Sequence, residues 1–232
     1  MSLSMRAITK SFSSNAVLKG VDFALEDGEI RALIGENGAG KTTLMNILGG
    51  VLRPDAGVIE LDGKRVEFAS PRDSLAAGIA FIHQELNLVN DLNVYENLFL
   101  GRERVRGAFT DTARMREEAR AVLERMGMAL DPCAMVRDLD ASYKQVVEIA
   151  RALLFDARVI IMDEPTTSLT EPEIERVFSM MRTVKEQGVS IVFISHKLRE
   201  VLEICDTYTV LRDGVNVAAG ATRETTEAEL AR

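Results

Sequence analysis

The stretch GENGAGKTT at residues 35–43 directly follows an apolar run, RALI, and continues into a second apolar segment, TLMNILGGV. It fits the pattern G-x-x-x-x-G-K-[ST], in which glycines let the backbone wrap around phosphate groups at the start of a helix. A glycine-rich turn without a ligand is the alternative, and the strand–loop–helix setting argues against it. The stretch therefore predicts a nucleotide site at the core of an α/β fold.

Two side chains of this loop have specific expected roles. Lys41 is expected to reach the β- and γ-phosphates, and the Thr42 hydroxyl is expected to bind Mg²⁺. The backbone N–H groups are expected to point at the phosphates. The predicted nucleotide-binding residues of the loop are Gly35, Glu36, Asn37, Gly38, Ala39, Gly40, Lys41, Thr42 and Thr43.

Polar residues follow two later apolar runs, VIIMDE and SIVFISH. Short runs rich in Val and Ile are typical of buried parallel strands. Asp163 ends the first run and is the expected second partner of Mg²⁺, and Glu164 is the expected general base. His196 ends the second run and is a candidate γ-phosphate contact. By themselves these residues fit a solvated loop and a capping histidine, but the phosphate loop favours a site.

Turn signals and hydrophobic periods predict the rest of the architecture. The alternation in AVLKGVDFAL predicts a strand, which the Asp-Gly pair at 27–28 would turn into EIRALIG. GVIELDGKRV predicts a second hairpin, turned at 62–63. Residues 87–157 are mostly helical in pattern and predict a helical subdomain inserted into an α/β core made of 1–86 and 158–232.

Composition limits the classes of protein that fit. The 232 residues, 47% of them hydrophobic, are enough for one good core. The net charge of −8 argues against a broad nucleic-acid surface, so no nucleic-acid partner is expected. Cys133 and Cys205 lack metal-ligand spacing, and free thiols without a signal-like start fit a reducing cytosol. No apolar run approaches the roughly 18 residues that span a bilayer, so membrane association is expected through partners.

The order of the motifs resembles that of the ATP-binding subunit of ABC transporters along nearly the whole chain. The phosphate loop is followed by FIHQE, LDASYKQVVEIARAL, VIIMDEPTTSLT and ISH. This resemblance implies a P-loop NTPase (RecA-like) core, an antiparallel β subdomain and a helical subdomain that docks on membrane-embedded partners. The stretch HQELNLVNDLNVYENLFLGRE, with VVEIARAL, is most similar to the class that imports ribose, galactose and similar monosaccharides.

The resemblance also implies roles for residues that mean little by themselves. Phe12 falls where the family stacks an aromatic ring on adenine, and a core phenylalanine on an early strand is the alternative. Gln84 matches a glutamine that approaches Mg²⁺ and senses the transmembrane subunits. Residues 168–170 (SLT) match a loop that crosses to a partner ATPase domain, where the commoner pattern ends in Asp. The implied catalytic set is Glu164, His196 and Gln84, and the implied metal set is Thr42, Gln84 and Asp163.

The family signature, usually Leu-Ser-Gly-Gly-Gln, is altered in this chain to Leu139, Asp140, Ala141, Ser142 and Tyr143. In the family, the signature serine and the N–H groups of this helix start bind the γ-phosphate held by the other ATPase domain. Asp140 is an expected helix N-cap. It is also a negative charge that would repel a phosphate by roughly 1–4 kcal/mol at about 4 Å. We therefore expect a weakened composite site, and Asp140→Ser should tighten ATP-driven pairing.

The resemblance implies ATP and Mg²⁺ as cofactors and MgATP hydrolysis that powers sugar import. The implied partners are a second ATPase domain, transmembrane permease subunits and, indirectly, a sugar-binding protein. The chain would be cytoplasmic and peripheral on the inner face of the cell membrane. Thr226 and Glu229 form a capping-box pattern for a short last helix, and we expect the chain to be the first of two tandem ATPase domains.

Two alternatives to sugar import stay open at this point. One is a nucleotide-gated regulatory module in which the altered signature has removed productive turnover. The other is a soluble ABC protein of DNA repair or translation. The repair relatives carry long coiled-coil insertions, which are absent from this sequence, and the acidic balance also argues against nucleic acid.

Overall fold

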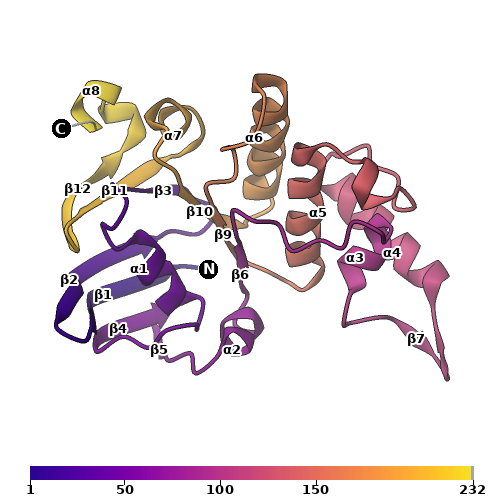
Figure 1. The fold of residues 1–232 in the computed structure, drawn as a ribbon, viewed down its shortest axis with the longest axis horizontal. Helices are drawn as coiled ribbons and strands as arrows, with labels where there is room; N and C mark the ends of the chain where they lie inside the picture. The colour runs from indigo at the N-terminus through magenta and orange to yellow at the C-terminus, as the bar shows by residue number, and fades with distance from the viewer. Residues whose placement is uncertain (231–232) are drawn as a thin grey trace.

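A six-stranded sheet forms the centre of the computed structural model, which describes residues 1–230 (Figure 1). Its order is β12-β11-β3-β10-β9-β6. Its strands are β3 (Ile30–Ile34), β6 (Ile79–Ile82), β9 (Val159–Asp163), β10 (Ser190–Ile194), β11 (Thr207–Arg212) and β12 (Val215–Ala221). All pairs are parallel except β11 with β12. The side chains of β9 and β10 are almost all buried, as expected for parallel strands covered on both faces.

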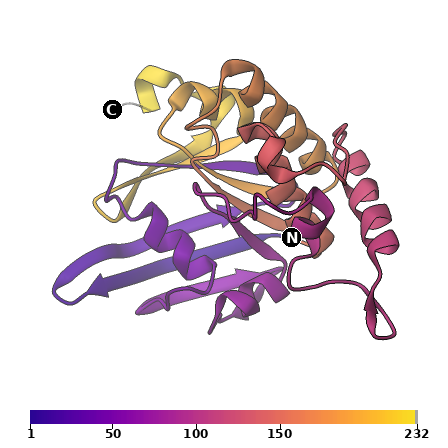
Figure 2. The ribbon, with the colours of Figure 1, turned by 45° about the vertical axis from the view of Figure 1, so that its right-hand side comes forward.

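A four-stranded antiparallel sheet, in the order β2-β1-β4-β5, forms a second layer (Figure 2). Its strands are β1 (Leu3–Phe12), β2 (Asn15–Leu25), β4 (Ala56–Leu61) and β5 (Lys64–Val66). The hairpin predicted at residues 62–63 is confirmed, because β4 and β5 pair across this turn. The predicted α/β fold with an antiparallel β layer is therefore confirmed.

The hairpin predicted at residues 27–28 is wrong, because β2 and β3 belong to different sheets. The residues of β3 are buried on both faces except Arg31, so this strand needs cover on both sides and enters the central sheet. β2 alternates between exposed and buried residues and stays in the outer layer. Two hydrogen bonds fix the chain after β2, from Gly28 N–H to Ser190 Oγ (3.0 Å) and from Ile30 N–H to Asp206 Oδ2 (2.8 Å).

The helices cover both faces of the central sheet. They are α1 (Lys41–Leu48), α2 (Pro71–Ala76), α3 (Val94–Phe99), α4 (Thr112–Arg125), α5 (Ala141–Leu154), α6 (Glu171–Glu186), α7 (Leu198–Ile204) and α8 (Glu227–Leu230), with 3-10 turns at Val136–Asp138 and Thr222–Glu224. The apolar side of α1 shares a core with the four-stranded sheet and one face of the central sheet. The larger core joins the other face to the helices from α3 to α7. In the described part of the chain, no helix has both the length and the apolar character needed to span a membrane.

The helices α3, α4 and α5 gather at one end of the molecule, together with a short hairpin of β7 (Val105–Arg106) and β8 (Phe109–Thr110) (Figure 1). They all lie within residues 87–157, which we continue to propose as an inserted helical subdomain. At the other end of the chain, Thr226 N–H donates to Glu229 Oε2 (2.9 Å) and Glu229 N–H donates to Thr226 Oγ1 (3.4 Å). The predicted capping box is thus present at the start of α8.

Candidate functional site

The phosphate loop joins β3 to α1 at the carboxyl end of the central sheet. Gly40, the residue before α1, has a φ of 102°, and a Cβ there would lie 2.6 Å from Leu18 Cδ2. A Cβ on Gly35 would lie 2.4 Å from the carbonyl oxygen of Leu211. Close packing against neighbouring strands therefore requires glycine at both ends of the loop and fixes its backbone.

Lys41 is a buried cation at the start of α1. Its Nζ donates to the carbonyl oxygens of Gly35 (2.6 Å) and Glu36 (3.1 Å). Burial lowers the pKa of Lys41, whereas the negative charges of Glu164 and Asp163 act in the opposite direction. No side chain of the described residues caps the N-terminus of α1. A lysine beside an uncapped helix start is suited to bind an anionic group.

The predicted Mg²⁺ ligands come from three elements of the fold. Thr42 lies exposed in the first turn of α1, and Asp163 is the partly buried last residue of β9. Gln84 lies exposed in the loop after β6, the strand that pairs with β9. Burial raises the pKa of Asp163, and the adjacent charge of Glu164 raises it further. Hydroxyl, carboxylate and amide oxygens fit Mg²⁺, so this ligand set stays a prediction that the donor chemistry supports.

His83 lies near this site and was not predicted from the sequence. Its ring stacks on Phe81 with the centroids 4.2 Å apart. Its charge also lowers the pKa of Asp163, which places the imidazole in the neighbourhood of that carboxylate. β6 ends at Ile82, and residues just beyond the carboxyl ends of parallel strands gather at one edge of the sheet. The strand-end argument that indicates Asp163 therefore also indicates His83.

The structure brings Glu164 and His196 together. His196 Nδ1 lies 2.8 Å from Glu164 Oε1, and Thr167 Oγ1 lies 3.4 Å from Glu164 Oε2. The backbone of Glu164 has a φ of 49° and its N–H donates to the carbonyl oxygen of Ile194 (3.0 Å). A non-glycine residue in this left-handed conformation is uncommon and is often found at functional sites. Glu164 is therefore held in a defined position at the edge of the sheet.

Two other predicted contact regions lie at the surface. Phe12 ends β1 and is 45% exposed, with Lys10 Nζ 5.8 Å from its ring centroid, so it is not a core residue. An exposed ring of this kind is available for stacking. Thr170 is the N-cap of α6 and forms a capping box with Glu173, whose Oε2 accepts from the N–H (2.8 Å) and the hydroxyl (2.7 Å) of Thr170. Ser168, two residues earlier, is exposed.

Asp140 is the N-cap of α5, as predicted. Its Oδ1 accepts hydrogen bonds from Tyr143 N–H (2.9 Å) and from the Ser142 hydroxyl (2.7 Å). Its Oδ2 accepts from Arg176 Nη1 at 2.9 Å. Partial burial would raise the pKa of Asp140, but these hydrogen bonds and the arginine charge together lower it. Arg176 lies on α6, 36 residues away in sequence, and the sequence analysis did not identify it.

Asp163→Asn is expected to raise the melting temperature at neutral pH by a few degrees, since about 1 kcal/mol corresponds to roughly 2–4 °C in a chain of this size. The pKa of Asp163 is raised in the folded state, so the folded state disfavours the charged carboxylate. The parent chain therefore loses stability as the pH rises from the unfolded pKa through the folded pKa of Asp163, and the Asn variant does not. The gain should therefore vanish in acid. Thermal unfolding across pH measures it, with Glu117→Gln, an exposed acid on α4, as control. An unchanged or lower melting temperature at neutral pH would contradict it.

Comparisons with known proteins identify relatives of this chain. The ABC transporter family model matches residues 18–167. The chain is 54% identical over 215 residues to a ribose import ATP-binding protein RbsA of Chromobacterium violaceum. The aligned region covers 92% of this chain and 43% of that relative. It is 45% identical to the RbsA protein of Lacticaseibacillus paracasei, and here the aligned region covers 100% of this chain and 47% of that relative. The chain thus spans about half the length of these curated relatives.

Solved structures show the same architecture. An ATP-binding cassette of an ABC transporter in its ADP conformation superposes with a TM-score of 0.85 at 26% identity, over 100% of this chain and 94% of that one. A nucleotide-free cassette superposes with a TM-score of 0.83 at 26% identity, over 95% and 92%. Since the family model covers more than half of the chain and these structures cover nearly all of it, the chain belongs to the ABC transporter family.

Proposed function

We propose that the chain binds and hydrolyses MgATP and that this hydrolysis powers the import of a sugar. The observation that carries the proposal is the convergence of Lys41, Asp163 and the Glu164–His196 pair at one edge of the central sheet. The names of the relatives support the proposal that the imported substrate is a sugar, since those proteins are called ribose import ATP-binding proteins. Phe12 would stack on the adenine.

In the proposed reaction, some side chains bind the nucleotide and others take part in proton transfer. Lys41 and the loop N–H groups would bind the β- and γ-phosphates, and Mg²⁺, held by Thr42, Asp163 and Gln84, would supply charge neutralisation. Glu164 would accept a proton from the attacking water. His196, at 2.8 Å from the carboxylate, would orient Glu164 and contact the γ-phosphate.

The proposed reaction requires a second ATPase domain. The signature segment, residues 139–143, and the loop at 168–170 would face the nucleotide held by that domain. A dimeric cassette bound to ADP and Pi, 24% identical with a TM-score of 0.77, shares the fold of this chain. Bringing two such domains together would exclude bulk water and align the one water molecule that attacks the γ-phosphate. The two domains would separate after hydrolysis.

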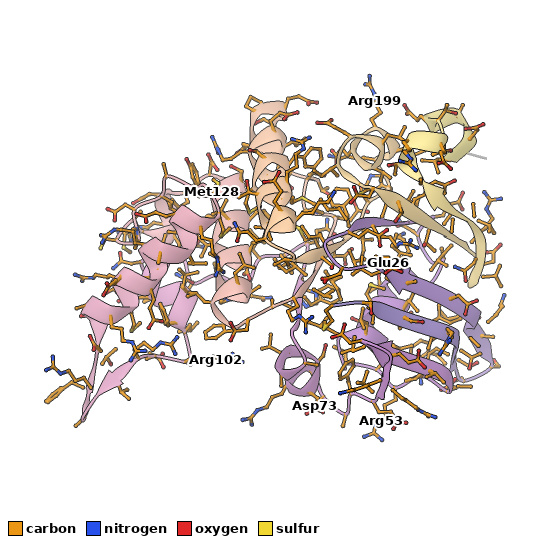
Figure 3. The ribbon with its side chains drawn as sticks, turned by 180° about the vertical axis from the view of Figure 1, so that it is seen from behind. Glu26, Arg53, Asp73, Arg102, Met128 and Arg199 are labelled. Atoms are coloured by element: carbon orange, nitrogen blue, oxygen red, sulfur yellow. The ribbon has the colours of Figure 1, made fainter. Side chains whose placement is uncertain are left out.

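A groove beside the Gln84 loop is the proposed contact with permease subunits. Its volume is about 390 Å³, and residues of α2, β6 and α5 line it. The loop residues His83, Asn87 and Arg102 also line it (Figure 3 labels Arg102). Glu148 Oε1 accepts from Asn87 N–H (2.9 Å), and Arg151 Nη1 donates to the Asn87 carbonyl oxygen (3.1 Å). These bonds connect the groove to α5, whose first turn carries the signature segment. The chain would thus be peripheral on the inner face of the membrane.

Phosphate release from MgATP tests the enzymatic part of this proposal. We expect release that requires Mg²⁺ and Lys41, whereas a nucleotide-gated regulatory module would bind ATP without releasing phosphate. Ribose uptake by cells that carry the full-length transporter tests the transport part. Uptake should be lost with Glu164→Gln, and unchanged uptake would contradict a role in sugar import.

A further inference from the structure

The buried serine of the signature segment has its single proton engaged by Asp140. Ser142 is 0% exposed, and its hydroxyl donates to Asp140 Oδ1 at 2.7 Å. A hydroxyl carries one donor hydrogen, so Ser142 cannot donate to Asp140 and to another oxygen at the same time. Its oxygen also accepts a hydrogen bond from Arg176 Nη1. In this arrangement Ser142 is neither accessible nor free to donate to a phosphate.

Arg176 is the accessible donor at the same place. Its side chain is 32% exposed, and its guanidinium lies 4.4 Å from the centroid of the Tyr143 ring, a contact that holds its plane. The hydrogen bonds to Asp140 and Ser142 both use Nη1. The donors on Nε and Nη2 therefore have no hydrogen-bond partner among the described residues. A guanidinium presents several donors in one plane and binds phosphate oxygens in pairs.

We infer that Arg176 of α6, which lies beside the start of α5, and not Ser142, is the side chain that faces the γ-phosphate of a partner ATPase domain. The inference rests on the proposed function, because it places a partner's nucleotide at the signature segment. Arg176 would compensate for two effects of Asp140 on phosphate binding. Its charge offsets the carboxylate that would repel a phosphate, and its remaining N–H groups replace the hydroxyl proton that Asp140 engages. Arg176 thereby makes the altered signature able to accept ATP.

The test measures ATP-driven pairing of the chain by sedimentation with MgATP, in a Glu164→Gln background that holds the nucleotide. Three variants are compared: Arg176→Gln, Arg176→Lys and Ser142→Ala. Arg182→Gln is the matched control, because Arg182 lies on the same helix and makes an exposed ion pair with Glu203 at 3.6 Å. Thermal unfolding of each variant separates a loss of pairing from a loss of folding.

Arg176→Gln is expected to weaken pairing about tenfold or more, the size of a unit-charge interaction at about 4 Å near a protein surface. Arg176→Lys keeps the charge and should stay within about threefold of the parent, and Ser142→Ala should cost less than about threefold. In the Asp140→Ser background, which removes the carboxylate and restores the usual serine at this position of the signature, pairing should tighten. These outcomes support Arg176 as the phosphate-facing residue.

Other outcomes would overturn the inference. It fails if Ser142→Ala costs as much as Arg176→Gln, or if Arg176→Gln has no larger effect than Arg182→Gln. It also fails if the parent chain binds MgATP but stays monomeric, since Arg176 would then not complete the site. Direct titration of ATP into the monomer keeps the two proposals apart. Without ATP binding, the proposed function itself fails.

Discussion

Replacing Glu164 by glutamine is expected to lower the rate of phosphate release by about 10²–10⁴-fold, the usual contribution of a positioned general base. The amide has nearly the same shape but cannot accept the proton of the attacking water. The carboxylate lies 2.8 Å from His196 Nδ1, and the backbone of Glu164 has a left-handed conformation, so the proposed base is held in a defined position. Single-turnover phosphate release at saturating MgATP measures this loss.

The control for this prediction is Glu117→Gln, which makes the same chemical change at an exposed position of α4 and should keep the parent rate. ATP titration of the Glu164→Gln chain should still show binding. A Glu164→Gln chain that releases phosphate within about threefold of the parent rate would assign the base to another residue.

Replacing Lys41 by alanine is expected to weaken ATP binding by about 100-fold. A charge-assisted hydrogen bond contributes about 1.5–3 kcal/mol, and a tenfold change in affinity corresponds to about 1.4 kcal/mol. Lys41 is buried, so its charge acts in a medium that screens it less than water does. Calorimetric titration of ATP measures the change.

Lys64→Ala, at an exposed position of β5, is the control for this prediction. Because the Lys41 ammonium also binds the carbonyl oxygens of Gly35 and Glu36, unfolding of each variant is followed in parallel. If the alanine variant does not fold, the same ATP titration is made with Lys41→Gln, which keeps a hydrogen-bond donor but lacks the charge. ATP affinity equal to that of Lys64→Ala would exclude Lys41 from the phosphate site.

The sequence was most informative where a chemical pattern coincided with a change of hydrophobic period. The loop at residues 35–43 and the acids at the end of β9 combine both signals, and they lie at the same sheet edge in the structure. The hairpin at residues 27–28 failed because turn residues do not reveal which sheet the following strand enters. That choice depends on the burial of β3 on both faces, which is a tertiary property.

Arg176 shows what a sequence pattern cannot supply. The Asp at position 140 raised a question about charge, but its partner lies 36 residues later on another helix. Only the packing of α5 against α6 brings the guanidinium to the carboxylate and to the ring of Tyr143. His83 differs, because its position just after β6 gave a usable signal.

The proposed composite ATPase site is tested most directly by the rate of phosphate release per chain, measured at saturating MgATP over a wide range of protein concentration. Release should depend on Glu164, and its rate per chain should rise with concentration, because the proposed reaction needs two ATPase domains to meet over the nucleotide. A rate per chain that is independent of concentration would contradict the composite site. No release at any concentration would contradict the proposal that the chain hydrolyses ATP.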